Sequence, residues 1–197
     1  NNYRCILYMP KKINKEEQKY LDMYDELFFI KGQLDKCKFI ANINRTKKLG
    51  LKNGNQKGLG FTNPVGLKLN YCNGNYELPR FDEVNSSGIY LNICKFISKY
   101  YPNHQFNALT INKNFRCKKH TDNKNVGVSW IVGLGDYDGG DLNLYTNEEE
   151  KDRKYSWIAE DEKHNIKYRP MMFDGSEIPH DVDEWTGTRY SIVAYYL

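Results

Sequence analysis

The chain has 197 residues, 40% of them hydrophobic and 14% aromatic, so it is long enough for one compact domain and too rich in aromatic residues for a disordered segment. Its apolar runs, such as residues 27–30, are far too short to cross a membrane, and no signal peptide is visible. The five cysteines are scattered and contain no CxxC pair, which argues against a disulfide framework or a zinc ribbon and favours reduced thiols in an intracellular compartment, cytoplasmic or nuclear.

The net charge of +4 conceals an uneven distribution along the chain. Residues 1–100 hold 17 Lys and Arg against 9 Asp and Glu, whereas residues 101–197 hold 12 against 16. Between residues 31 and 76, nine basic residues are opposed by a single acidic one, Asp35. Such a segment would attract a polyanion such as nucleic acid by releasing counterions. A solvated, lysine-rich loop has the same composition, and both interpretations stay open at this point.

Two helices are predicted in the first half of the chain. Residues 13–31 begin with a capping box, Asn14 followed by Glu17. The apolar residues that we expect to face the core from this helix are Leu21, Tyr24, Leu27 and Phe28. A second helix is predicted from about Asp82 or Ser87 to Tyr100, ended by Pro102. Its expected buried residues are Ile89, Ile93, Phe96 and Ile97. Between the helices, the Asn-Gly pairs at 53–54 and 73–74 mark turns.

After Pro102 the pattern becomes typical of short strands. Strands are predicted at residues 106–111 and 126–134, and the Tyr137-Asp138-Gly139-Gly140 sequence is expected to form a tight turn that leads into a partner strand at 142–145. Further strands are expected near 155–159, 167–172, 180–182 and 189–196, with a turn at residues 184–188 before the last one.

This order predicts an α+β fold, a double-stranded β-helix (a jelly-roll or cupin-like sandwich) buttressed by N-terminal helices. We expect residues 1–197 to form a single domain, in which 1–104 give helical and loop support and 105–197 form the jelly-roll catalytic core.

The His120-Thr121-Asp122 sequence and His180 are the candidate metal ligands. Residues two apart in an extended strand point to the same side, so His120 and Asp122 can bind one ion together, and His180 must arrive from a distant strand. Two neutral imidazoles and one carboxylate suit Fe(II) and leave coordination positions free on the opposite side. The alternative is that His120 lies on the surface and His180 packs at a strand edge.

Arg189 and Ser191 form the second part of the candidate site. Arg189 follows His180 by nine residues, and Ser191 points to the same side two positions later. A guanidinium there can hold a carboxylate with two parallel hydrogen bonds. A dicarboxylate that chelates iron at one end and binds arginine at the other is 2-oxoglutarate, which makes Fe(II), 2-oxoglutarate and O₂ the predicted cofactors and cosubstrates.

The stretch from Asn107 to Leu144 resembles the 2-oxoglutarate/Fe(II)-dependent dioxygenase superfamily. The resemblance rests on the Ile-Asn-x-Asn, His-Thr-Asp-Asn-Lys-Asn, Gly-Val-Ser, Gly-Asp-Tyr-Asp-Gly-Gly and Leu-Asn-Leu sequences, and the similar part covers roughly residues 105–197. Within the superfamily it is most similar to the branch of the ten-eleven-translocation and J-binding-protein oxygenases, which oxidise the methyl group of 5-methylcytosine or thymine in DNA. The resemblance implies that His120, Asp122 and His180 bind the iron and that Arg189 and Ser191 bind the 2-oxoglutarate carboxylate.

The same resemblance implies an oxidoreductase that hydroxylates a C–H bond, with a nucleic-acid base methyl group as substrate and DNA as partner. Asn125 matches a position that contacts the target base in the methylcytosine oxidases, although an asparagine that caps its own turn would look the same.

Two departures limit the comparison. The chain lacks the cysteine-rich zinc region of the animal enzymes, and Tyr195 stands where alkylated-base repair enzymes carry a second arginine. The alternative function is a protein hydroxylase of the same superfamily, acting on prolyl, lysyl or asparaginyl residues. A third interpretation is a binding module that has lost its activity.

Overall fold

The structure is a computed structural model, and it describes residues 14–39, 61–66, 68–69, 76–77, 88–117, 119–146 and 162–197. The larger of its sheets is antiparallel and has the strand order β1 (Phe61–Gly66), β4 (Ala108–Lys113), β10 (Trp185–Tyr196), β5 (Val126–Gly139) and β8 (Met171–Phe173). A smaller antiparallel sheet has the order β7 (Glu162–His164), β6 (Leu142–Leu144) and β9 (His180–Val182). The pair β2 (Lys68–Leu69) and β3 (Tyr76–Glu77) forms a third.

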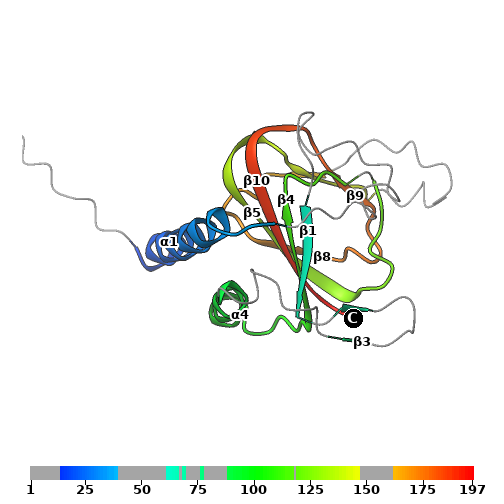
Figure 1. The fold of residues 1–197 in the computed structure, drawn as a ribbon, viewed down its shortest axis with the longest axis horizontal. Coiled ribbons are helices and arrows are strands. Elements are labelled where there is room, and N and C mark those ends of the chain that lie inside the picture. The colour runs from blue at the N-terminus through cyan, green and yellow to red at the C-terminus, as the bar shows by residue number, and fades with distance from the viewer. Residues whose placement is uncertain are drawn as a thin grey trace, which may run out of the picture.

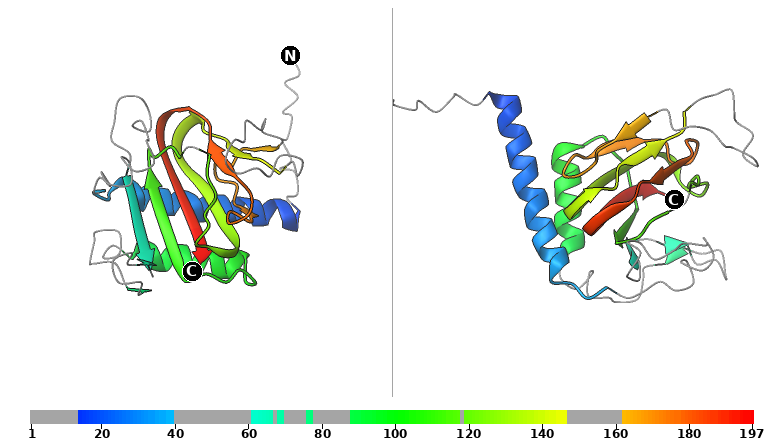
Figure 2. Two further views of the ribbon diagram at one scale, coloured as in Figure 1. Left: turned by 90° about the vertical axis from the view of Figure 1, so that its right-hand side faces the viewer. Right: turned by 90° about the horizontal axis from the view of Figure 1, so that it is seen from above.

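Two helices, α1 (Lys15–Asp35) and α4 (Ile89–Tyr100), lie side by side along one face of the larger sheet (Figures 1 and 2). The capping box of α1 is confirmed, because Asn14 Oδ1 accepts the Glu17 amide at 2.8 Å and Glu17 Oε2 accepts the Asn14 amide at 2.9 Å. The four predicted core residues of α4 are all buried. The described helices and antiparallel sheets therefore fit the predicted α+β class.

The predicted core-facing residues of α1 were largely wrong. The buried residues of α1 are Met23, Leu27, Ile30 and Leu34. Of the four that we expected, only Leu27 is buried, whereas Leu21, Tyr24 and Phe28 are about half exposed. The cause is that α1 is apolar around much of its circumference, so spacing alone does not tell which side meets the sheet. Tyr24 and Phe28 instead contact Tyr168 at the edge of the core, with ring centroids 4.9 and 6.5 Å away.

Side-chain alternation divides the larger sheet into two faces. The face toward the helices carries Leu109, Ile111, Trp130, Val132, Leu134, Tyr190, Ile192 and Ala194, which belong to one core cluster with α1 and α4. The intervening residues point to the opposite face, which we call the inner face. There Ile131 and Phe173 pack with Leu142 and Leu144 of the smaller sheet in a second cluster. The inner face therefore lies between the two sheets, and it carries the predicted site residues of β10.

Two predicted turns were wrong. Residues 137–139 continue β5 and pair with residues 185–187 of β10, so neither the 137–140 turn nor the 184–188 turn exists as expected. The strand expected at 142–145 does form, as β6, but it pairs with β7 and β9 and not with β5. Gly139 and Gly140 both have positive φ, and a chain that bends here passes from one sheet to the other.

Other expectations differ less from the structure. The strand predicted at residues 106–111 is observed at 108–113 as β4. β1 lies in the N-terminal part that we expected to give helices and loops, and it pairs with β4 in the larger sheet. The strand at 155–159, both Asn-Gly turns and most of the basic segment lie outside the described residues. None of the described helices is long and apolar enough to cross a membrane.

Candidate metal centre

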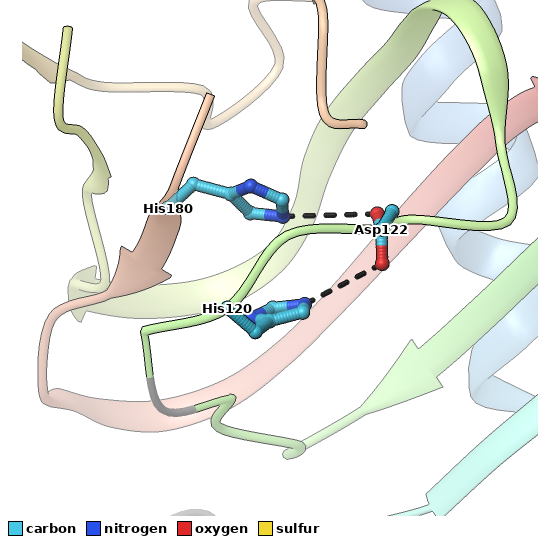
Figure 3. Close-up of side chains that lie close together, drawn as sticks. All are labelled: His120, Asp122 and His180. Carbon is cyan, nitrogen blue, oxygen red and sulfur yellow. Dashed lines mark ion pairs between the residues drawn. The ribbon is translucent and has the colours of Figure 1, made fainter. Parts of the chain in front are cut away.

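Three predicted side chains that are distant in sequence converge at one place. His120, Asp122 and His180 each offer a ligand atom, and these atoms all lie within 4.8 Å of one another (Figure 3). His120 Nε2 lies 3.5 Å from Asp122 Oδ1, and His180 Nε2 lies 3.7 Å from Asp122 Oδ2. The two imidazoles thus approach different oxygens of one carboxylate.

Backbone pairing brings the two histidines together. His120 lies in an isolated antiparallel bridge with His180, in which each backbone amide donates to the other residue's carbonyl at 3.1 and 2.9 Å. The strand predicted at residues 106–111 was expected to lead into the segment that carries His120 and Asp122. β4 ends at Lys113, and the bridge to His180 gives His120 its extended pairing. The ring centroids of His120 and His180 are 4.4 Å apart as a result.

The position of Asp122 is set by two backbone hydrogen bonds. Its amide donates to Gly175 O at 2.7 Å, and its carbonyl accepts the Asn125 amide at 2.8 Å, which closes a turn. A Cβ on Gly175 would lie 3.5 Å from Asp122 Oδ2 and 3.5 Å from His180 Cε1. These are ordinary van der Waals distances, so the segment after β8 lies directly against the site at Gly175.

His180 is oriented so that one ring nitrogen faces the site. Its Nδ1 lies 2.9 Å from Ile178 O, and since a carbonyl can only accept, Nδ1 carries the proton and Nε2 has a free lone pair. The Phe173 ring packs edge-on against His180, with centroids 4.9 Å apart. Burial lowers the pKa of His180, and the neighbouring His120 lowers it further while Asp122 opposes. The neutral imidazole that a metal needs is thus favoured.

This arrangement fits a metal ion with one open side. Two atoms that each lie about 2.1 Å from one ion are at most about 4.2 Å apart. The His120–Asp122 and His180–Asp122 contacts, 3.5 and 3.7 Å, lie within that limit, and the ligand atoms of all three residues lie within 4.8 Å of one another. The side chain of His180 is 8% exposed, whereas those of His120 and Asp122 are 24% and 27% exposed. The donor set of two nitrogens and one carboxylate suits Fe(II).

Arg189 is a buried cation on the inner face. It is 2% exposed, and its Nε and Nη2 atoms are buried without a hydrogen-bond partner in the part of the chain that the structure describes. No described carboxylate lies within ion-pair distance of it. Because side chains alternate between the two faces along a strand, Arg189 is the one charged side chain that β4, β5, β8 and β10 place on the inner face. An uncompensated buried charge is costly, so a buried guanidinium with free donors indicates a site for an anion.

Two aromatic residues that the sequence analysis missed flank Arg189. The guanidinium carbon lies 5.4 Å from the ring centroids of both Tyr137 and Trp185. The Tyr137 hydroxyl is itself buried and has no hydrogen-bond partner among the residues with a described position. Burial lowers the pKa of Arg189, and Tyr137 nearby opposes this. Both aromatic residues fell in predicted turns. If the last strand had been predicted to begin at Trp185 and not at Arg189, strand alternation would have placed Trp185 on the same face as Arg189.

The remaining predicted residues lie close by but are already engaged. Ser191 is buried next to Arg189 on the inner face, and its Oγ accepts Asn112 Nδ2 at 3.2 Å. Asn125 is half-buried, and its Nδ2 donates to Ser129 Oγ at 3.3 Å. Its backbone amide closes the turn after Asp122, and its side chain is turned toward Ser129. The role of Asn125 in binding a base therefore stays a prediction.

No protein-family model matches the chain, and the comparison with curated proteins finds no match. Among solved structures, NgTET1 in complex with 5mC DNA aligns with a TM-score of 0.50 and 15% identity, over 93% of this chain and 69% of that one. An oxidoreductase of the 2OG-Fe(II) oxygenase family from Burkholderia pseudomallei aligns at 0.47 and 13% identity, over 69% and 67% of the two chains. A prolyl-4-hydroxylase from Pseudomonas putida aligns at 0.39 and 12% identity, over 89% and 86%. These neighbours are 2-oxoglutarate/Fe(II) oxygenases, and at 15% identity the likeness to NgTET1 concerns the fold alone.

Proposed function

We propose that this chain is an Fe(II)- and 2-oxoglutarate-dependent dioxygenase. The observation that carries the proposal is the convergence of His120, Asp122 and His180 beside the inner face. Among the described residues, Arg189 is the one charged side chain on that face and has no anionic partner. The double-stranded β-helix is part of the same proposal, and the likeness to the fold of NgTET1 supports it.

In this proposal His120, Asp122 and His180 hold the iron. Bound iron with 2-oxoglutarate and O₂ would supply the oxidising power to hydroxylate a C–H bond, a reaction that amino-acid side chains cannot perform. The protein's own part is orientation. The Ile178 carbonyl fixes which nitrogen of His180 faces the ion, and the Gly175 carbonyl fixes the backbone of Asp122.

Arg189 would bind the carboxylate of 2-oxoglutarate that lies away from the metal. Its free Nε and Nη2 atoms can donate to the two oxygens of one carboxylate, and the hydroxyls of Ser191 and Tyr137 are further donors on the same face. Because Arg189 is buried, water does not compete for these hydrogen bonds, which strengthens them.

The proposed substrate is the methyl group of a nucleic-acid base, 5-methylcytosine or thymine. NgTET1, which shares the fold, was solved with 5mC DNA, and the resemblance of residues 107–144 points to the same branch. An enzyme that modifies a base must take it out of the helix stack, so the base would reach the exposed side of His120 and Asp122.

The test is incubation with Fe(II), 2-oxoglutarate and DNA that contains 5-methylcytosine, followed by measurement of succinate and of oxidised nucleosides by mass spectrometry. We expect both products from the wild type and neither from His120→Ala, because one ligand fewer weakens metal binding. Unchanged activity of His120→Ala would refute the ligand assignment. Succinate production that depends on a prolyl, lysyl or asparaginyl peptide and not on DNA would favour the protein hydroxylase instead.

A further inference from the structure

Tyr145 lies on the side of the smaller sheet that faces away from the larger one. Leu144 of β6 packs between the two sheets, so alternation turns the residues before and after it, Asn143 and Tyr145, outward. In β9, His180 pairs with Leu144 and points inward, toward the candidate metal centre. Asp181 pairs with Asn143 and points outward. We call the side that carries Asn143, Tyr145 and Asp181 the outer face.

Tyr145 is hydrogen-bonded to the residues on both sides of His180. Its backbone amide donates to Pro179 O at 3.0 Å, and its hydroxyl donates to Asp181 Oδ2 at 3.0 Å. The other oxygen of that carboxylate, Oδ1, accepts Asn143 Nδ2 at 3.0 Å. Tyr145 is buried, and the exclusion of water strengthens such contacts. The position of His180 is therefore linked to Tyr145 through the residue before it and the residue after it.

The ring of Tyr145 also contacts the residue that precedes His120. Lys119 Nζ lies 3.7 Å from the centroid of the Tyr145 ring. Because His120 pairs with His180 and points inward, the preceding side chain points to the outer face. A cation over an aromatic ring is attracted to it, more strongly where water is partly excluded, and Lys119 is half-buried. Tyr145 therefore contacts the segments of both histidines from the side opposite to the metal.

We propose that Tyr145 is a positioning residue of the metal centre, which keeps His120 and His180 at a fixed separation. It does so through its contacts with Lys119 and Asp181. This inference rests on the proposed function, because it takes the two histidines as ligands. His120 belongs to no strand of the described part of the chain and pairs through an isolated bridge, so a further link between the two segments adds order to the ligand set. Residues that orient metal ligands in this way typically change metal affinity by about 10–100-fold.

Co(II) tests this inference, because it accepts the same nitrogen and oxygen ligands as Fe(II), is stable in air, and has a visible spectrum that depends on ligand geometry. The full chain is titrated with Co(II) alone, and the Kd, the spectrum of the bound ion and the urea midpoint are measured. Tyr145→Leu, which loses the ring and the hydroxyl, should bind Co(II) more weakly by roughly tenfold or more, with an altered spectrum. Tyr145→Phe, which keeps the ring but loses the hydrogen bond to Asp181, should have an intermediate Kd.

The matched control is Tyr100→Leu. Lys99 Nζ lies 4.8 Å from the centroid of the Tyr100 ring, and the Tyr100 hydroxyl donates to Glu26 Oε1 at 2.9 Å. Tyr100 thus makes the same two kinds of contact as Tyr145, but it does so at the end of α4, on the helix side of the larger sheet. Tyr100→Leu should lower the urea midpoint and should bind Co(II) like the wild type, with the same spectrum.

Lys119→Met provides a second test that does not depend on the folding of Tyr145→Leu. Methionine keeps an unbranched apolar chain over the ring and removes the charge, so this variant should also bind Co(II) more weakly than the wild type.

Wild-type Kd and spectrum in both Tyr145→Leu and Lys119→Met, or an equal loss of affinity in Tyr100→Leu, would overturn this inference. If the wild type nevertheless binds Co(II) and forms succinate from 2-oxoglutarate with Fe(II), the proposed function survives and only the role of Tyr145 is lost. If the wild type binds no Co(II), the metal site fails, and the proposed function fails with it.

Discussion

Replacement of Arg189 by methionine should separate the stability of the protein from its ability to bind 2-oxoglutarate. Arg189 is 2% exposed, and no residue that the structure describes offers a hydrogen-bond partner to its Nε and Nη2, so its burial opposes folding in the absence of an anion. The rings of Tyr137 and Trp185 compensate in part through cation–π contacts. Methionine fills a similar volume with no charge to desolvate. The ligand-free Arg189→Met protein should therefore be at least as stable as the wild type, with a gain on the order of 1–4 kcal/mol in the free energy of unfolding.

The effect on binding should have the opposite sign. Two hydrogen bonds to a carboxylate, each contributing about 1.5–3 kcal/mol, are lost in Arg189→Met. At 1.4 kcal/mol for each factor of ten, the Kd for 2-oxoglutarate should rise by roughly 100-fold or more. Ligand at 100 times its Kd should stabilise the wild type by about 2.7 kcal/mol, and at the same concentration it should leave the variant nearly unchanged.

Urea denaturation with and without 2-oxoglutarate, in the presence of the metal, measures both effects, and calorimetric titration gives the Kd. Arg169→Met is the control, because Arg169 is exposed and lies outside the inner face. A ligand-free Arg189→Met protein that is clearly less stable than the wild type, together with unchanged 2-oxoglutarate binding, would refute the reasoning. It would mean that Arg189 is a structural residue.

Three further outcomes are expected. Asp122→Asn should keep the fold but weaken Fe(II) binding at least tenfold in a calorimetric titration. His164→Gln, which lies outside the candidate metal group, should bind Fe(II) like the wild type. Equal Fe(II) affinities of the two variants would contradict the assignment of Asp122 as a ligand. Burial lowers the pKa of His104, so as the pH falls below about 6.5 the unfolded chain takes up a proton first and the free energy of unfolding decreases. The urea midpoint of the wild type should therefore drop between pH 7.5 and 5.5. The drop should be smaller in His104→Gln, which has no imidazole to protonate. Leu27→Ala should cost about 2–5 kcal/mol, because Leu27 is fully buried, while Leu21→Ala on the exposed side of the same helix should cost less than about 1 kcal/mol; comparable losses would argue against the observed orientation of α1.

The sequence predicted a feature of a helix correctly where interactions between residues close in sequence determine that feature. The capping box of Asn14 and Glu17 lies at the start of α1, and the buried stripe of α4 is the one that its spacing indicated. Capping and a narrow apolar stripe involve residues within one or two helical turns, so they are legible in the chain. The orientation of α1 could not be predicted in this way, because its apolar residues surround the helix and contact with the sheet decides which of them are buried.

The turns failed for a related reason. Gly139-Gly140 has the composition of a hairpin turn, yet β5 continues to Gly139 because residues 185–187 of β10 provide its partner. Whether a glycine pair reverses a strand or redirects it to another sheet depends on which strand lies alongside, and that strand is more than 40 residues away in the sequence.

The identities of the groups that gather at the site were already present in the order of residues. A histidine and an aspartate two positions apart, a later histidine, and an arginine nine residues beyond it indicate a metal and an anion because few other chemistries use that set. The tertiary structure adds how these side chains are arranged relative to one another. The His120–His180 bridge and the aromatic neighbours of Arg189 arise from strand pairing between distant segments. Such pairing depends on the free energy of the whole sheet, which no short window of residues contains.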